Sequence, residues 1–311
     1  MVTAADRAKG PARASVWLGG KVTRTRRTDQ PAGLDLDKIT AATVRLLDSE
    51  GLAKFSMRRL AAELGVTAMS VYWYVDTKDD LLELALDAVM GELALPGTDE
   101  DGGDQDRSGD RDQGRSVDRD QDRSGDRDQG QSVDRDQDRS GGQGAGDWRV
   151  QLRRLAAGYR SILVRHPWVS PLVGVFLNIG PHAVKFAAAS QDVMRHADLP
   201  LRGQTGGLAA VFQFVYGFGT VEGHFRDRCA RAGMTQDEYH RHAMGGMSEQ
   251  PSLRRTFEQA QDVMAARGGD TVEEMRERDF DFALDLLIAG IEAKREAGEG
   301  PERGSAAADG H

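Results

Sequence analysis

The sequence predicts an all-α protein with two helical domains on either side of a polar linker. Apolar residues recur at helical spacing in residues 35–95 and again in residues 148–296. Ser, Thr and Asp stand where these helices are expected to begin, and Gly stands where several of them end. Between the two helical regions lies a polar repeat with too few apolar residues to build a core.

Composition limits the class of protein. The chain has 311 residues, which is enough for about two domains. Its single cysteine, Cys229, rules out an internal disulfide and fits a reducing cytoplasm. No apolar stretch of signal-peptide length follows the basic N-terminus, and no apolar run approaches the about 18 residues of a membrane span. We therefore expect a soluble, cytoplasmic protein with no membrane partner.

The first 34 residues read as a basic, disordered arm. Residues 1–30 hold seven Lys or Arg against two Asp, a balance that is compatible with a polyanionic partner. A solvated tail is the commoner meaning of such an arm, so its role stays open. The other end of the chain, residues 297–311, is also assigned to a disordered tail.

Two helices with clear local signals follow the arm. Asp35 is a suitable N-cap for a helix that continues to Gly51. Ser56 is a suitable N-cap for a second helix, which Gly65 ends by supplying the positive φ of a sharp turn.

Two more helices follow the turn. Thr67 can cap a third helix only two residues after Gly65. Thr77 and Asp80 match the capping-box pattern at the start of a fourth helix, which continues to about Leu93. The second and third helices with the turn between them make a helix-turn-helix on a three-helix base.

The third helix carries three consecutive aromatic residues, Tyr72, Trp73 and Tyr74. Consecutive helical positions point about 100° apart, so a single buried face cannot hold all three rings. Val71 and Val75 can anchor the helix to the core, with Trp73 or part of Tyr72 completing that face. An exposed tyrosine here is best explained as a DNA contact, and the alternative is an aromatic cluster that lies wholly inside the domain.

The side chains on the outer face suit DNA. Small residues at a helix N-terminus permit close approach, and an apolar Ala or Met can touch a thymine methyl group. Ser, Thr and Tyr hydroxyls can hydrogen-bond phosphate oxygens. Lys78, in the first turn of the fourth helix, adds a positive charge where the DNA backbone is expected to pass.

Residues 34–89, which contain "LGVTAMSVYWYVDTKDDLL", resemble the N-terminal domain of the TetR family of transcriptional repressors. The resemblance implies a homodimer, a recognition helix in the major groove, and release of the operator when a small molecule binds the C-terminal domain. It also implies ten DNA-binding residues by position. They are Ser56, Met57 and Arg58 at phosphate or base edges, Thr67, Ala68, Met69 and Ser70 at the bases, and Tyr72, Tyr74 and Lys78 at the backbone.

Residues 96–147 are predicted to form a disordered linker. "DQDRSGDRDQGRSVDR" at 104–119 recurs as "DQDRSGDRDQGQSVDR" at 120–135, and a third copy begins at 136. Asp, Arg, Gly, Ser and Gln without apolar periodicity are typical of disordered segments. Calcium binding is a weaker alternative, because no aspartate series here has EF-hand spacing.

Residues 148–296 resemble, less specifically, the helical effector-binding and dimerisation domain of the same family. "DWRVQLRRLAAGYRSILVRHPWV" predicts a helix that Pro167 ends near His166. Residues 208–227 and 280–295 predict long apolar helices. One apolar stripe on the last helix could belong to the core of one subunit, but the resemblance favours a dimeric four-helix bundle with an interface made by Phe280, Leu284, Leu287, Ile288 and Ile291.

An effector pocket is expected inside this domain, with apolar walls and a few polar anchors. The candidates, each of which could equally be ordinary core, are Phe176, Asn178, His182, Phe186, Phe212, Phe214, Tyr216, Glu222 and His224. His182 and His224 could hold a metal-chelated drug, although their spacing does not require it. "DEYHRH" at 237–242 also permits a metal site, but a solvated helix face is the commoner meaning of such a run. We assign no metal and no cofactor.

The sequence argues against an enzyme. It contains no GxSxG, HExxH, P-loop or Cys-x-x-Cys pattern. "GFGTVEG" from Gly217 misses the dinucleotide-binding spacing and lies in a helical context. We therefore predict a DNA-binding transcriptional regulator, a repressor that a small-molecule effector releases from its operator. The alternative is a DNA-binding regulator or architectural protein without an effector. Neither operator nor effector can be named from the sequence.

Overall fold

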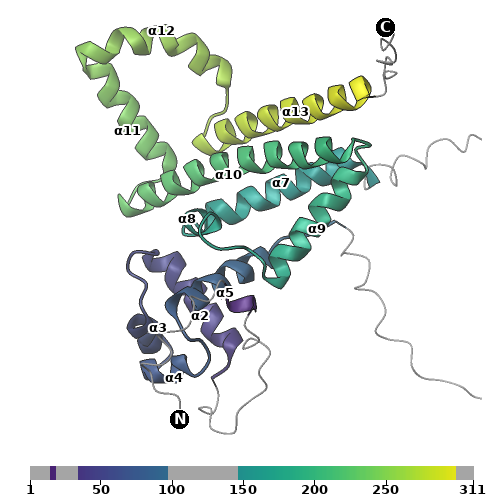
Figure 1. The fold of residues 1–311 in the computed structure, drawn as a ribbon. Coiled ribbons are helices and arrows are strands. Elements are labelled where there is room, and N and C mark those ends of the chain that lie inside the picture. The colour runs from purple at the N-terminus through teal and green to yellow at the C-terminus, as the bar shows by residue number, and fades with distance from the viewer. Residues whose placement is uncertain (1–14, 19–33, 97–145, 299–311) are drawn as a thin grey trace, which may run out of the picture.

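The computed structural model describes residues 15–18, 34–96 and 146–298, and within these ranges every regular element is a helix (Figure 1). The helices form an N-terminal unit and a larger C-terminal unit that pack against each other. Most of the predicted arm, all copies of the polar repeat and most of the predicted tail lie outside the described residues, so those assignments stay predictions. Within the same ranges, no helix is both long enough and apolar enough to cross a bilayer.

The N-terminal unit contains four α-helices whose ends follow the local signals. They are α2 (Leu36–Glu50), α3 (Met57–Glu63), α4 (Ala68–Tyr72) and α5 (Lys78–Met90). Helices α2 and α5 pack together, and α3 and α4 pack against each other at the end of the molecule remote from the C-terminal unit (Figure 1).

All four predicted N-caps are confirmed. Asp35, Ser56, Thr67 and Thr77 each accept a hydrogen bond from a backbone N–H three residues on. At Thr77 the predicted capping box is complete, because the Asp80 carboxylate accepts the Thr77 N–H in return.

The turns that separate these helices use glycine as predicted. Gly51 has φ 80° and Gly65 has φ 65°, in the left-handed region where a side chain is strained. The sharp turn at Gly65 allows α4 to start three residues later and to cross α3, which completes the helix-turn-helix.

A short part of the basic arm is packed, which corrects the prediction that all of residues 1–34 are disordered. Residues Val16–Leu18 form a single 3₁₀ turn, η1, against α5. The Ser15 hydroxyl and the Val16 N–H both donate to the Glu83 carboxylate on α5, and the Val16 side chain is buried. Such contacts involve residues distant in sequence, so no local signal indicates them.

The C-terminal unit is built around three long helices. Helix α7 (Trp148–Arg165) lies along α10 (Leu201–Arg231), and α13 (Val272–Gly298) lies over α10 on the other side (Figure 1). Helix α7 ends at Arg165, with His166 as its C-cap directly before Pro167, as predicted. The remaining helices are α8 (Ser170–Val173), α9 (Pro181–Arg195), and the projecting pair α11 (Gln236–Glu249) and α12 (Pro251–Arg267).

The close approach of α7 and α10 depends on glycine. A Cβ added at Gly223 would lie 2.6 Å from the Leu163 carbonyl oxygen, which is closer than real Cβ contacts. The two helices therefore meet backbone to backbone at this point, and any larger residue would push them apart.

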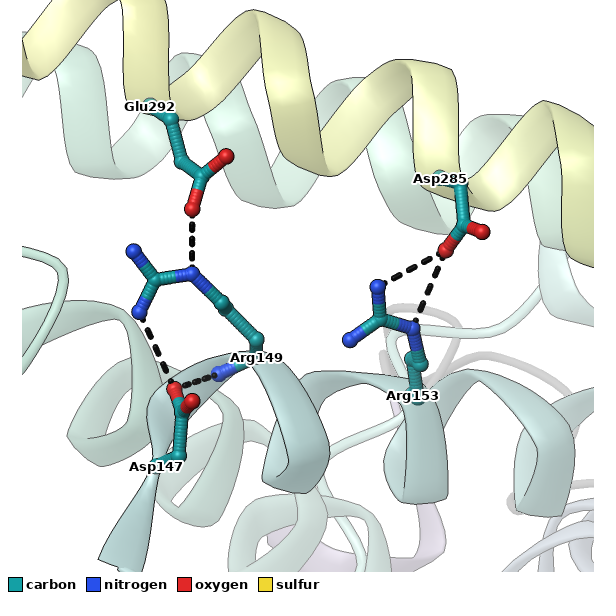
Figure 2. Close-up of polar contacts among 5 residues, drawn as sticks. All are labelled: Asp147, Arg149, Arg153, Asp285 and Glu292. Atoms are coloured by element: carbon teal, nitrogen blue, oxygen red, sulfur yellow. Dashed lines mark hydrogen bonds and ion pairs between the residues drawn. The ribbon is translucent and has the colours of Figure 1, made fainter. Parts of the chain in front are cut away.

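Ion pairs join α7 to α13 along the surface of the unit (Figure 2). The Arg153 guanidinium donates to Asp285 through Nη2 at 2.7 Å and Nε at 3.1 Å. Arg149 pairs with Glu292 and also donates from its backbone N–H to Asp147, the N-cap of α7, at 2.9 Å. These pairs are partly exposed, so each contributes little to stability, but together they fix the relative position of the two helices.

The apolar stripe predicted as the dimer interface instead faces the core of a single chain, which is a correction. Phe280 stacks on Phe214 at 5.4 Å between ring centroids and meets Phe218 at 5.3 Å. Leu284, Ile288 and Ile291 are buried within one chain, and Leu287 packs partly buried against the same core. The sequence showed that one face of this helix is apolar, but not which of its neighbours covers that face.

Candidate DNA-binding surface and effector cavity

Helix α4 is held by two buried residues and presents its other faces to solvent. Val71 and Val75 are fully buried against the N-terminal core. The Thr67 hydroxyl caps the helix and also lies 2.9 Å from the Ser70 hydroxyl. The first turn of α4 is therefore rigid, which suits a helix that must approach a partner closely.

Three large side chains on or next to α4 remain exposed: Met69 at 69%, Tyr72 at 43% and Trp73 at 53%. The sequence predicted that Trp73 or part of Tyr72 completes the buried face, and the exposure of Trp73 excludes the first alternative. Ala68 and Tyr74 pack beside Val71 and Val75 instead. A five-residue helix with two large exposed residues and a third at its C-cap exposes an unusually large apolar surface for so short a segment. It offers methyl, thioether and ring contacts to a partner surface.

Three predicted DNA-binding residues are placed differently from the expectation. Met57 is buried in the N-terminal core, so it is removed from the DNA-binding set. Tyr74 is half-buried, and its hydroxyl donates to the Leu34 carbonyl oxygen at 2.6 Å. This bond ties the segment that leads into α2 to the end of α4, so Tyr74 supports the helix. Ala68 is half-buried and packs against the core.

The other members of the predicted set lie at the surface. Ser56, Arg58 and Thr67 are exposed, and Ser70 and Lys78 are half-buried. The Lys78 ammonium lies 5.4 Å from the centre of the Phe55 ring, which restrains it near the start of α5. The assignment of these residues to DNA contacts stays a prediction.

A cavity of about 550 Å³ lies where the two units meet. Its walls come from α5, α7, α9, α10 and the segment after α8. Three aromatic rings form one wall: Tyr159 lies 5.6 Å from Phe186 and 5.9 Å from Phe212, and Phe186 lies 5.2 Å from Phe212. The volume is within the range of small-molecule sites, about 300–1,000 Å³.

The nine predicted effector residues divide into two groups. Asn178, Phe186, Phe212 and Tyr216 line the cavity, whereas Phe176 lines only a small neighbouring hollow. The other four lie outside both hollows.

The four outlying candidates have other contacts. Phe214 packs on Phe280 in the α10–α13 core, and Glu222 forms a buried ion pair with Arg160 at 2.8 Å. His182 pairs with Asp87, and His224 lies 3.5 Å from the Ser170 hydroxyl. None of the four lines the cavity. The structure does not favour the alternative in which His182 and His224 together hold a metal-chelated drug, because neither side chain lines the cavity.

Sequence reasoning missed several residues that line the cavity, which are Leu86 and Met90 of α5, Tyr159 of α7, and Ser190, Gln191 and Gln213. Tyr159 had a usable signal: it is an aromatic residue with a hydroxyl among the buried residues of α7, which are otherwise mostly aliphatic. The α5 residues had none, because their position depends on how the two units pack.

No metal site was found in the described part of the chain: no group of three or more His, Cys, Asp or Glu residues is placed to hold an ion. The "DEYHRH" run begins in the first turn of α11. There Tyr239 packs edge-on against Phe225 and accepts a hydrogen bond from Arg228 at 2.7 Å.

A buried carboxylate connects the N-terminal unit to the cavity. Asp87 of α5 accepts the backbone N–H groups of His182 at 3.0 Å and Ala183 at 2.9 Å, so it caps α9 from a different helix. Its second oxygen lies 2.9 Å from His182 Nδ1. A Cβ at Gly180 would clash with Asp87, so glycine is needed there. Helix α9 is a wall of the cavity, and its start is therefore fixed to α5.

A second junction is centred on buried His166. Its Nδ1 lies 2.6 Å from Asp48 Oδ1 of α2, and its Nε2 lies 3.3 Å from Glu92 Oε2 after α5. Arg165 also pairs with Glu92 at 2.7 Å, and Trp168 Nε1 donates to Asp48 at 2.6 Å. Burial lowers the pKa of His166, but hydrogen bonds and attraction from Asp48 and Glu92 outweigh it, so the pKa stands above its ordinary value.

An exposed apolar face remains on the outer side of α10 and α13. Phe282 is 68% exposed and Leu286 is 60% exposed on α13, four residues apart. Val221 is exposed on the neighbouring α10. Neighbouring helices with exposed apolar residues can pack against the same helices of a second subunit and form a two-fold interface.

Both units match families of bacterial regulatory proteins related to the tetracycline repressor. The family described as "Bacterial regulatory proteins, tetR family" matches residues 39–85. The family described as "Tetracyclin repressor-like, C-terminal domain" matches residues 140–295.

Curated relatives span nearly the whole chain. An HTH-type transcriptional regulator of Saccharopolyspora erythraea is 30% identical over 265 residues, covering 84% of this chain and 85% of the relative. The HTH-type transcriptional repressor DrrR1 of Streptomyces coeruleorubidus is 26% identical over 281 residues, covering 89% and 83%. Among solved structures, ActR of Streptomyces coelicolor in complex with actinorhodin has the same fold, with a TM-score of 0.54 at 20% identity over 87% of this chain and 100% of that one.

Proposed function

Because this chain belongs to the TetR family of bacterial regulatory proteins, we propose that it is a homodimeric repressor that a small molecule releases from its operator. The proposal extends to a cytoplasmic location and to the absence of catalytic activity. The relatives over nearly the whole chain are transcriptional regulators, which supports both extensions.

One observation carries the proposal: helix α5 belongs to both the DNA-binding unit and the cavity. It begins with Lys78, behind the Thr77 capping box, only a few residues after the end of α4. Its last turns place Leu86 and Met90 in the cavity wall. A molecule that fills the cavity contacts Leu86 and Met90 of α5 directly and can therefore displace this helix. Because α5 follows α4 in the same unit, a displacement of α5 also changes the position of α4.

Two further contacts support coupling between cavity and DNA-binding unit. Asp87 fixes the start of α9 to α5, and Asp48 with Glu92 fixes the end of α7 to the N-terminal unit. A change in the cavity walls is thus transmitted through packed helices. The proposal gives the polar repeat at 104–141 no part in this transmission, because the packed helices already connect the cavity to the DNA-binding unit.

On DNA, each subunit presents one recognition helix, so a dimer is expected to bind a pseudo-palindromic duplex. The exposed Met69, Tyr72 and Trp73 supply base-edge and backbone contacts in the major groove. The exposed face of α10 and α13, with Phe282 and Leu286, supplies the interface that sets the spacing of the two half-sites.

The test uses the full-length protein in two steps. Selection from a random duplex pool should yield a pseudo-palindromic site, and a thermal-shift screen of a small-molecule library should yield molecules that raise the melting temperature. Those molecules should release the protein from the selected site in a mobility-shift assay. A protein that binds its site but responds to no molecule in the screen would favour the alternative, a DNA-binding regulator without an effector.

A further inference from the structure

The cavity lining restricts the chemistry of its occupant. Among the described residues, the fifteen that line the cavity include no Asp, Glu, Lys, Arg or His. The charged groups nearby are already paired: Asp87 caps α9, and Glu222 pairs with Arg160. A charged molecule would therefore lose its hydration without gaining a partner of opposite charge, which is costly.

The aromatic wall selects for shape. The Tyr159, Phe186 and Phe212 rings stand at interplanar angles of 34° and 73°, so they present both ring faces and ring edges. Aromatic rings interact favourably with other flat rings in offset or edge-on geometry. Met90, an adaptable side chain from α5, completes the apolar lining.

The polar groups of the lining are mostly in use. The Tyr216 hydroxyl donates to the Ser170 carbonyl at 2.9 Å, and the Ser190 hydroxyl donates to the Phe186 carbonyl at 2.8 Å. The Asn178 amide nitrogen donates to the Val173 carbonyl at 2.8 Å. These three donors hold the cavity walls in place and are not available to a ligand.

Among the buried residues of the lining, Tyr159 has a hydroxyl that remains available to a ligand. The ring is buried, and the hydroxyl makes no hydrogen bond to another residue in the described part of the chain. Burial, with a smaller contribution from Tyr216, raises the pKa of Tyr159 to about 12, so the hydroxyl keeps its proton at neutral pH and can donate. The hydroxyl is not among the fully enclosed unpartnered polar atoms and Tyr159 lines the cavity, so a ligand or water there can accept its hydrogen bond.

We propose that the cavity takes an uncharged, flat, aromatic molecule with a carbonyl or phenolic oxygen, and that Tyr159 donates a hydrogen bond to that oxygen. This inference rests on the proposed function, since it names the class of effector for the same cavity. Gln191 and Gln213, which also line the cavity and are largely exposed, provide amide contacts at its mouth.

The test compares three probes of the same ring size on the full-length dimer by isothermal titration calorimetry. They are 9,10-anthraquinone, which is neutral and has carbonyl acceptors, anthracene, which has none, and anthraquinone-2-sulfonate, which adds a fixed charge. We expect anthraquinone to bind at least about tenfold more tightly than the sulfonate, because the site offers the charge no partner. We also expect it to bind more tightly than anthracene.

The matched variant is Tyr159→Phe, which removes one oxygen atom and keeps the ring. It should weaken anthraquinone binding about fivefold, within the range of a single neutral hydrogen bond, and leave anthracene binding unchanged. Equal or tighter binding of the sulfonate, binding of none of the three probes, or no selective effect of Tyr159→Phe would overturn the proposal. Binding to the selected DNA site is measured without any probe. Loss of DNA binding would count against the proposed function. If DNA binding is retained while the probes fail, only the proposed class of ligand is wrong.

Discussion

Replacing Leu286 with Asp should separate the dimer while leaving each subunit folded. The Leu286 side chain is 60% exposed in a single chain and lies one turn after Phe282, which is 68% exposed. Burial of a leucine side chain contributes about 1.5–3 kcal/mol, so covering the exposed part of Leu286 contributes about 1–2 kcal/mol in each subunit. A two-fold interface contains the residue twice, which doubles this loss to about 2–4 kcal/mol. The introduced carboxylate also loses hydration in the interface.

The Kd of dimerisation should therefore rise by at least about 30-fold. Sedimentation velocity measures the dimer fraction over a dilution series, and a thermal melt checks that the subunit remains folded. Val184→Asp is a matched control, because Val184 is a similarly exposed apolar residue, at 52%, and lies on α9 rather than on α10 or α13. If Leu286→Asp stays as dimeric as the control, the α10–α13 face is not the interface and the reasoning fails.

Three further predictions concern other parts of the chain. Lys78→Ala should weaken binding to all DNA sequences and lower the slope of log K against log salt by about one unit, measured by fluorescence anisotropy; an unchanged slope would remove Lys78 from the backbone contacts. His166 has a raised folded pKa, so its stabilising effect is full below about pH 6.5 and is lost as pH rises through the folded value. The melting temperature should fall over that window in the native protein and fall less in His166→Asn, and parallel profiles would contradict this. Deletion of residues 104–141 should leave melting temperature, dimer mass and operator affinity unchanged, and loss of effector response alone would show that the repeat belongs to the switch.

The helix ends were predictable because their signals are local. Asp35, Ser56, Thr67 and Thr77 each bond to a backbone N–H within the same turn, so four residues of sequence contain the whole interaction. The sharp turn at Gly65 is equally local, since it depends on the φ angle of one residue.

The directions of side chains were less predictable, because they depend on contacts distant in the sequence. Tyr74 donates to Leu34, 40 positions earlier, and this contact takes it away from the predicted DNA surface. The apolar stripe with Phe280 was assigned to a partner subunit, but Phe214 of α10 covers it within one chain. Periodicity shows that a face is buried and does not show what buries it.

The cavity was predictable in kind but only partly in its members. Aromatic residues of α9 and α10 were among the candidates, whereas Met90 was not, because α5 reaches the cavity only when the two units pack. Two polar candidates already have partners: Glu222 forms an ion pair with Arg160, and His182 pairs with Asp87. Buried polar residues in such domains are more often structural than ligand contacts.

The central claim is that α5 couples the cavity to the recognition helix, and thermodynamic reciprocity tests it most directly. Operator Kd is measured by fluorescence anisotropy with and without a saturating molecule from the thermal-shift screen, and the Kd of that molecule is measured with and without saturating operator. Coupling requires both ratios to be equal, and the usual range of coupling energies predicts a factor of about 5–150. A molecule that binds the cavity, loses affinity on Phe212→Ala, and leaves operator Kd unchanged would contradict the account.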